Sequence, residues 1–266
     1  MSSPSTGITL LARAGYAAKG IVYLVIGFLA ARAAAGAGGT TTDPKGAVRI
    51  IGNGPFGDGF LLVIGIGLLG YTLWRLVAAI TDAERRGDDA SSLAMRGAGA
   101  ARGLAYGALG IRALREIGAS PAPSGDQAKH WTARLLALPF GRALVMAVGL
   151  GVIGYAGYQV YRACSDKVTK HLDLDEAGPA LATWITRFGR FGIAARAVVF
   201  AMIGVFLLRA AREYDPNEAG GIAQSLSQLS AGPYGRLVLG VVALGLVAYG
   251  SYSLATARYR FIRAIG

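Results

Sequence analysis

The stretch PFGDGFLLVIGIGLLGYTLW, residues 55–74, sets the pattern of the whole chain. A proline, an aromatic residue and a glycine open it, and two aromatic residues close an apolar run. It returns without a gap as PFGRALVMAVGLGVIGYAGY at 139–158 and as PYGRLVLGVVALGLVAYGSY at 233–252. Residues at i, i+3, i+4 and i+7 share one face of an α-helix. Each copy is therefore predicted to be a helix with small residues beside two aromatics.

A second motif precedes each copy: a basic residue followed four positions later by an aromatic one. Its three copies are Lys19 with Tyr23, Arg102 with Tyr106, and Arg196 with Phe200. The two motifs shift almost together along the chain, which defines a repeat of two helices. We expect one membrane domain over residues 1–266, with repeats at about 10–79, 93–163 and 187–258.

Composition favours a membrane protein. The 266 residues are 53% hydrophobic and only 16% charged, with 40 glycines. Soluble domains average about 25% charged residues, and glycine is more frequent in transmembrane helices than in soluble ones. The net charge is +12, but the basic residues flank apolar runs. Anionic lipid headgroups are therefore the expected partners, and nucleic acid is not.

Hydropathy and repeat register together predict six spans, at 15–35, 59–79, 97–114, 142–162, 191–210 and 236–256. About 20 residues cross the roughly 30 Å hydrocarbon layer. The third segment contains two arginines and would by itself indicate a surface helix; its place in the repeat predicts a span. The first is alternatively a signal peptide, but its motif recurs later in the chain. The predicted fold is all-α, with three tandem two-helix repeats around a pseudo-threefold axis.

Short apolar segments lie between the two helices of each repeat, at 47–51, 131–138 and 222–229. They are predicted either as helices on the membrane surface or as ordinary loops. Six spans place both termini on one side of the membrane. Of the 27 basic residues, 16 fall on that side, so the positive-inside rule predicts cytoplasmic termini.

A seam of small residues runs along the second helix of each repeat. Its members are Gly67, Gly70, Gly151, Gly154, Gly245 and Ala248. Small residues let helix backbones approach closely in lipid, so we expect helix–helix contacts here. The alternative is a ligand cleft lined by exposed backbone.

Three cations recur at one register: Lys19, Arg102 and Arg196. Each is predicted four to five residues into its span, at the depth of Tyr71, Tyr155 and Tyr249. One interpretation is a belt of snorkelling cations and interfacial aromatics. The other is a ring in which each cation lies beside aromatic faces and together they hold an anionic headgroup or solute.

Catalytic and metal-binding patterns are absent from the sequence. The two histidines, His130 and His171, are predicted on opposite sides of the membrane, so no metal site of ordinary spacing can form. No carboxylate lies within a predicted span, which disfavours a proton-coupled transporter. Neither a nucleophile elbow nor a phosphate loop is present. We expect no enzymatic activity, cofactor or metal.

The thrice-repeated combination of a basic residue, Pro-[Phe/Tyr]-Gly and Gly-x-x-[Gly/Ala]-Tyr-x-x-[Trp/Tyr] resembles a bacterial membrane family of unknown function with three two-helix repeats. The resemblance covers residues 10–258, with Lys19, Ala197 and Asp58 as departures. It implies the bacterial cytoplasmic membrane and supplies no activity. We expect a structural, accessory or lipid-binding protein that contacts anionic lipids or partner subunits. The alternative is a channel or carrier for a small anion along the axis.

Overall fold

The computed structural model describes residues 6–37, 41–82, 89–118, 127–165, 168–169, 172–174, 177–232 and 234–259. Six long helices lie within these residues: α1 (Thr6–Ala34), α3 (Gly57–Ile80), α4 (Ala90–Arg115), α6 (Gly141–Cys164), α7 (Gly178–Glu213) and α9 (Gly235–Tyr259). Short helices are α2 (Pro44–Gly52), α5 (Gln127–Leu136), α8 (Ile222–Ala231) and the 3-10 turn η3 (Pro216–Glu218). The described part of the chain contains no strand, so the all-α prediction is confirmed.

Five of the long helices are long and apolar enough to cross a membrane: α1 from Ala12 onward, α3, α6, α7 and α9. Their mean hydropathies lie between 1.6 and 2.3. The length and apolar composition of these helices therefore indicate a membrane protein. Helix α4 has 26 residues but is less apolar than the other five, because serine, glycine and alanine take many of the places that leucine, valine and isoleucine hold in those helices.

The second helix of each repeat matches its predicted span within three residues, whereas α1, α4 and α7 begin 9, 7 and 13 residues earlier than predicted. Each of these predicted spans begins just after an arginine, because a charged side chain lowers the hydropathy. The helix itself begins earlier and continues through the charged residue. In α4 the start is set by Asp89, whose side chain accepts a hydrogen bond from the backbone N–H of Ser92. Hydrogen bonds from Ser92 and Ser91 hold the pKa of Asp89 at about 2.

The Pro-aromatic-Gly motif forms the same turn in all three repeats. Its aromatic residues, Phe56, Phe140 and Tyr234, have left-handed backbones with φ of 62°, 60° and 59°. The following glycine presses against a backbone carbonyl of the segment before it: Gly57 against Gly52, Gly141 against Leu135, and Gly235 against Ser230. A Cβ would collide with fixed backbone there, so the motif needs glycine. Each turn joins a short helix to a long one.

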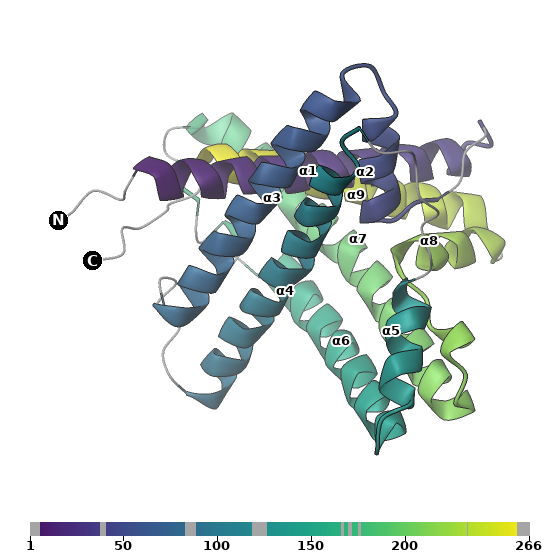
Figure 1. Ribbon diagram of the computed structural model, residues 1–266. Helices are drawn as coiled ribbons and strands as arrows, with labels where there is room; N and C mark the ends of the chain where they lie inside the picture. The colour runs from purple at the N-terminus through teal and green to yellow at the C-terminus, as the bar shows by residue number, and fades with distance from the viewer. Residues whose placement is uncertain are drawn as a thin grey trace.

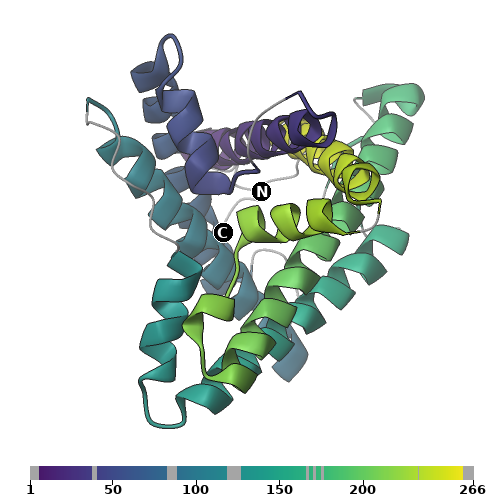
Figure 2. The same ribbon diagram turned by 90° about the vertical axis from the view of Figure 1, so that its right-hand side faces the viewer.

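The long helices pack as three pairs, α1 with α9, α3 with α4, and α6 with α7, each joining two different repeats. Figures 1 and 2 show these pairs as the sides of a rough triangle. The short helices α2, α5 and α8 gather at one end of it, facing the viewer in Figure 2.

The two long helices of one repeat pack on each other in the first and third repeats only. Helix α1 packs on α3, and α7 packs on α9. In the second repeat α4 is packed on α3 and α2, and α6 on α7 and α5, but α4 and α6 do not pack along each other. The long helices thus follow one another in space as α4, α3, α1, α9, α7 and α6, with an opening between the two ends of the series.

Small residues make the close helix contacts. A Cβ on Gly67 would lie 3.1 Å from the Cβ of Ala18 on α1, and one on Gly245 would collide with Ala195 on α7. Gly70 and Ala248 are buried as well. Helix α4 approaches α3 in the same way, and the Gly103 carbonyl accepts a 2.8 Å hydrogen bond from the Thr72 hydroxyl.

Gly151 and Gly154 depart from the predicted seam. Both are exposed, and a Cβ on either would meet nothing within 4 Å. The reason is that α4 does not pack on α6, so the face of α6 that carries these two glycines has no neighbouring helix. The same pattern of small residues therefore packs in the first and third repeats and stays open in the second.

We expect Gly245→Leu to destabilise the protein more than Gly151→Leu, although the two glycines occupy equivalent places in their repeats. The added side chain collides with α7 at position 245 and meets open space at position 151. Overpacking typically costs about 1–3 kcal/mol. Thermal unfolding in detergent measures the difference, and equal losses of Tm would contradict this packing.

Candidate functional site: a cluster of cations and tyrosines

The first feature of the site is a cation paired with a tyrosine of its own repeat. Arg102 Nη1 donates a hydrogen bond to the Tyr155 hydroxyl at 3.0 Å, and Arg196 Nη1 donates to the Tyr249 hydroxyl at 2.5 Å. Lys19 Nζ lies 5.8 Å from the ring centroid of Tyr71. The structure thus places all six predicted site residues in three like pairs, formed between the first and second helix of each repeat.

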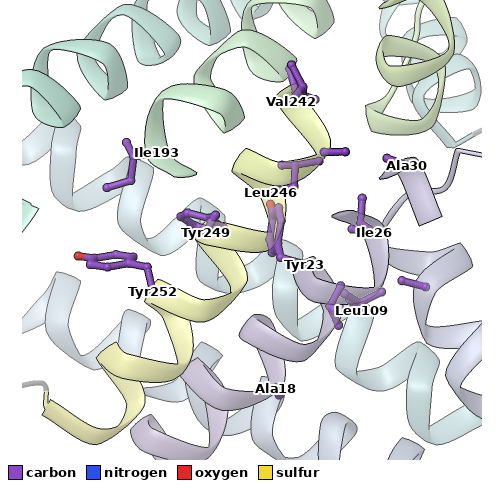
Figure 3. Packing of buried hydrophobic residues seen from close by; sticks show 14 of the residues in the cluster. Ala18, Tyr23, Ile26, Ala30, Leu109, Ile193, Val242, Leu246, Tyr249 and Tyr252 are labelled. Carbon is purple, nitrogen blue, oxygen red and sulfur yellow. The ribbon is translucent and has the colours of Figure 1, made fainter. Parts of the chain in front are cut away.

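The aromatic residue four positions after each cation links these pairs across repeats. Tyr23 meets Tyr249, Tyr106 meets Tyr71, and Phe200 meets Tyr155, with ring centroids 4.8, 5.3 and 5.6 Å apart. All three contacts are edge-to-face, an arrangement that contributes about 0.5–1.5 kcal/mol beyond burial. Figure 3 shows Tyr23 and Tyr249 side by side in the core. We call these nine residues the cation–tyrosine cluster.

The cluster lies inside the bundle. Lys19 is 7% exposed and Arg196 4%, while Arg102 is half-buried. Because α1 begins at Thr6, Lys19 lies 13 residues into it, roughly 20 Å along the axis. The predicted depth of four to five residues was counted from the start of the apolar span and stays a prediction. Lys19 and Arg196 are enclosed by the protein, whereas the side chains of a snorkelling belt extend to the membrane interface.

Charge compensation within the cluster comes from aromatic rings rather than carboxylates. Lys19 Nζ is 4.9 Å from the Tyr249 centroid and 5.5 Å from that of Tyr106. The Arg196 guanidinium is 4.8 Å from the ring centroids of both Tyr249 and Phe200. Each such contact contributes about 0.5–2 kcal/mol.

No described carboxylate forms an ion pair with Lys19 or Arg196. The Nε of Arg196 is buried and makes no hydrogen bond. An unpaired buried cation costs several kcal/mol, so the cluster is electropositive and incompletely satisfied.

A cavity of about 930 Å³ opens onto the cluster, within the size range of small-molecule sites. Arg196, Phe200 and Tyr23 line it from α7 and α1. One face of α4 forms its long wall, from Ala101 and Arg102 through Tyr106 to Arg115. The cavity lies between α4 and residues of α1, α2, α5, α7 and α8, an arrangement that residue spacing alone does not reveal.

Arg75 is a further member that sequence reasoning missed. Its Nε donates a 3.0 Å hydrogen bond to the Tyr71 hydroxyl, and its guanidinium lies 5.5 Å from the centroid of that ring. The equivalent positions in the other repeats carry Gln159 and Ser253. A search for residues common to all three copies therefore passes over it.

Metal ligands do not gather at this site. Within the described ranges, no group of three histidine, cysteine or acidic residues could hold a metal ion. His130 lies on α5, and His171 lies outside the described residues.

Comparison with known proteins identifies the repeat. The family described as "Domain of Unknown Function (DUF1206)" matches the chain three times, at residues 14–82, 98–166 and 191–260. The chain belongs to the DUF1206 family. It is also 34% identical over 248 residues to "Uncharacterized protein YxxB" of Bacillus subtilis (strain 168), covering 93% of this chain and 90% of the relative. No solved structure matches.

The DUF1206 matches coincide with the chemistry of the cluster. Each match contains one cation and its tyrosine: Lys19 and Tyr71, Arg102 and Tyr155, Arg196 and Tyr249. The predicted resemblance to a family of three tandem repeats is thereby confirmed. The DUF1206 description itself names no ligand or reaction.

Proposed function

We propose that this DUF1206 protein is a non-enzymatic membrane protein that binds an anionic lipid headgroup at the cation–tyrosine cluster. The observation that carries the proposal is Arg196: it is buried, it lines the cavity, and its Nε has no hydrogen-bond partner. An oxyanion beside it would accept that hydrogen bond and balance the charge, and charge-assisted hydrogen bonds are the stronger kind.

The proposal takes α4 as the sixth span and an approximate threefold axis through the cluster. Helix α4 has 26 residues, roughly 39 Å, which is long enough to cross. Gly103, Gly107 and Gly110 of α4 pack against α3, and Arg102 lines the cavity. The like contacts of the three repeats support the axis.

A small-anion channel or carrier remains the second candidate, because basic residues line both ends of the cavity. Arg102 and Arg196 stand at one end, and Lys45, Arg112 and Arg115 at the other. The lipid hypothesis is favoured because the wall between them is mainly alanine, aliphatic and aromatic residues, which suit a hydrocarbon chain better than a small ion.

Replacing Lys19, Arg102 and Arg196 together by glutamine should remove tightly bound anionic lipid, because the three positive charges are lost while side-chain length is nearly kept. Mass spectrometry of lipids retained after purification measures this. The matched control replaces Arg13, Arg142 and Arg187, which are exposed, and should keep the parent's lipid content.

Two outcomes decide the test. Retained lipid in a folded triple variant equal to that of the parent would contradict the proposal. If the triple variant does not fold, Arg102→Gln alone serves, since this half-buried residue leaves the two buried cations in place; it should lower lipid retention, and unchanged retention would contradict the proposal.

The proposal also places both termini in the cytoplasm of a bacterial inner membrane, supported by the 16 of 27 basic residues on that side. In a Cys164→Ser background, a cysteine at position 85 should resist an impermeant thiol reagent added to intact cells. Strong labelling from outside would reverse this topology.

A further inference from the structure

We infer that the ligand is a long-chain anionic amphiphile that enters sideways from the bilayer through the opening between α4 and α6, with its chain lying along α4. The inference rests on the proposed function, because it assigns the anionic end to the cation–tyrosine cluster. It adds the chemical class of the rest of the ligand and its route of entry.

In the other two repeats, an alanine of the first helix packs on a glycine of the second helix at the position that is open in the second repeat. Repeat spacing makes Ala18 and Gly67 of the first repeat, and Ala195 and Gly245 of the third, equivalent to Ala101 and Gly151 of the second. The first two pairs are in van der Waals contact. In the second repeat Gly151 has no neighbour within 4 Å, and Ala101 is exposed and lines the cavity.

The wall of long helices is therefore interrupted at this one place among the described helices. Two neighbouring helices that cross a membrane without packing on each other leave a gap that faces lipid. Arg102 reaches across it to the Tyr155 hydroxyl, so an arginine lies between the two helices. A molecule that enters here from lipid meets Arg102 first and Arg196 behind it.

The cavity wall suits a hydrocarbon chain. Ala101, Ala105 and Ala108 are exposed to the cavity and lie on one face of α4, and Ile111 continues that face. Ten residues of helix from Ala101 to Ile111 span roughly 15 Å. One leaflet of a bilayer, half of about 30 Å, has the same depth. The unpartnered Arg196 Nε and the adjacent Arg102 provide the charged end for a phosphate or carboxylate group.

Two probes separate the head from the chain: dodecyl phosphate and inorganic phosphate. Binding of each is measured to the whole protein in nanodiscs of zwitterionic lipid. Ala105→Trp places a large ring in the path of the chain. Leu104→Trp is the matched control, because Leu104 is 57% exposed and does not line the cavity.

We expect Ala105→Trp to weaken dodecyl phosphate binding at least about tenfold, the equivalent of two lost methylene contacts. Inorganic phosphate binding should be unchanged, and Leu104→Trp should change neither. The melting temperature of both variants shows that they are folded.

Other outcomes overturn the inference in distinguishable ways. If the parent binds both probes equally and Ala105→Trp has no effect, the site takes a small anion and the amphiphile is excluded, while an anionic site at the cluster stands. If neither probe binds the parent, the proposed function falls as well. If cysteines at positions 101 and 151, in a Cys164→Ser background, form a disulfide readily without ligand, α4 closes on α6 and the lateral opening is contradicted.

Discussion

The structure depends on burying two basic side chains, Lys19 and Arg196, with which no carboxylate in the described part of the chain forms an ion pair. Each repeat pairs one basic side chain with one tyrosine, and the tyrosine in turn meets an aromatic residue from the next repeat. Ring faces and hydroxyls stabilise a cation less completely than a carboxylate does. The arrangement holds three basic side chains near one another and leaves hydrogen-bonding capacity unused at Arg196. In the proposed function, an anionic headgroup would accept the hydrogen bond that Arg196 leaves unused.

Asymmetry between the repeats leaves this core beside an open cavity. Had α4 packed on α6 as α1 packs on α3, alanine against glycine would have closed the bundle. Helix α4 instead packs three of its glycines against α3 and turns Ala101, Ala105 and Ala108 toward a cavity. A repeat protein can thus use two copies of a motif to build a rigid frame and leave the third open.

Much of the fold could be predicted from sequence. The Pro-aromatic-Gly turn, the apolar length of the helices and the spacing of the copies determine the all-α repeat and the ends of α3, α6 and α9. The starts of α1, α4 and α7 could not be predicted, because charge ends an apolar segment without ending a helix. Gly151 and Gly154 show a second limit: glycine permits a neighbour to approach closely but does not supply one.

The candidate site was predictable in part from the spacing of the repeats. Equal spacing places Lys19, Arg102 and Arg196 at one register and gives each a tyrosine, but register alone does not decide whether side chains face lipid or the bundle. That choice depends on how α1 and α7 rotate against α9, which is a property of packing. Arg75 could not be predicted, because the residue type at its position differs in every repeat.

The most direct test of the central claim is an experimental structure of the protein in native lipid, at a resolution that shows bound headgroups. The account predicts density for an oxyanion within hydrogen-bond distance of Arg196 Nε and close to Arg102, continuing as a chain beside Ala105 and Ala108. A carboxylate of the protein itself in contact with Arg196, or helix α4 closed against α6 with no density between them, would contradict it.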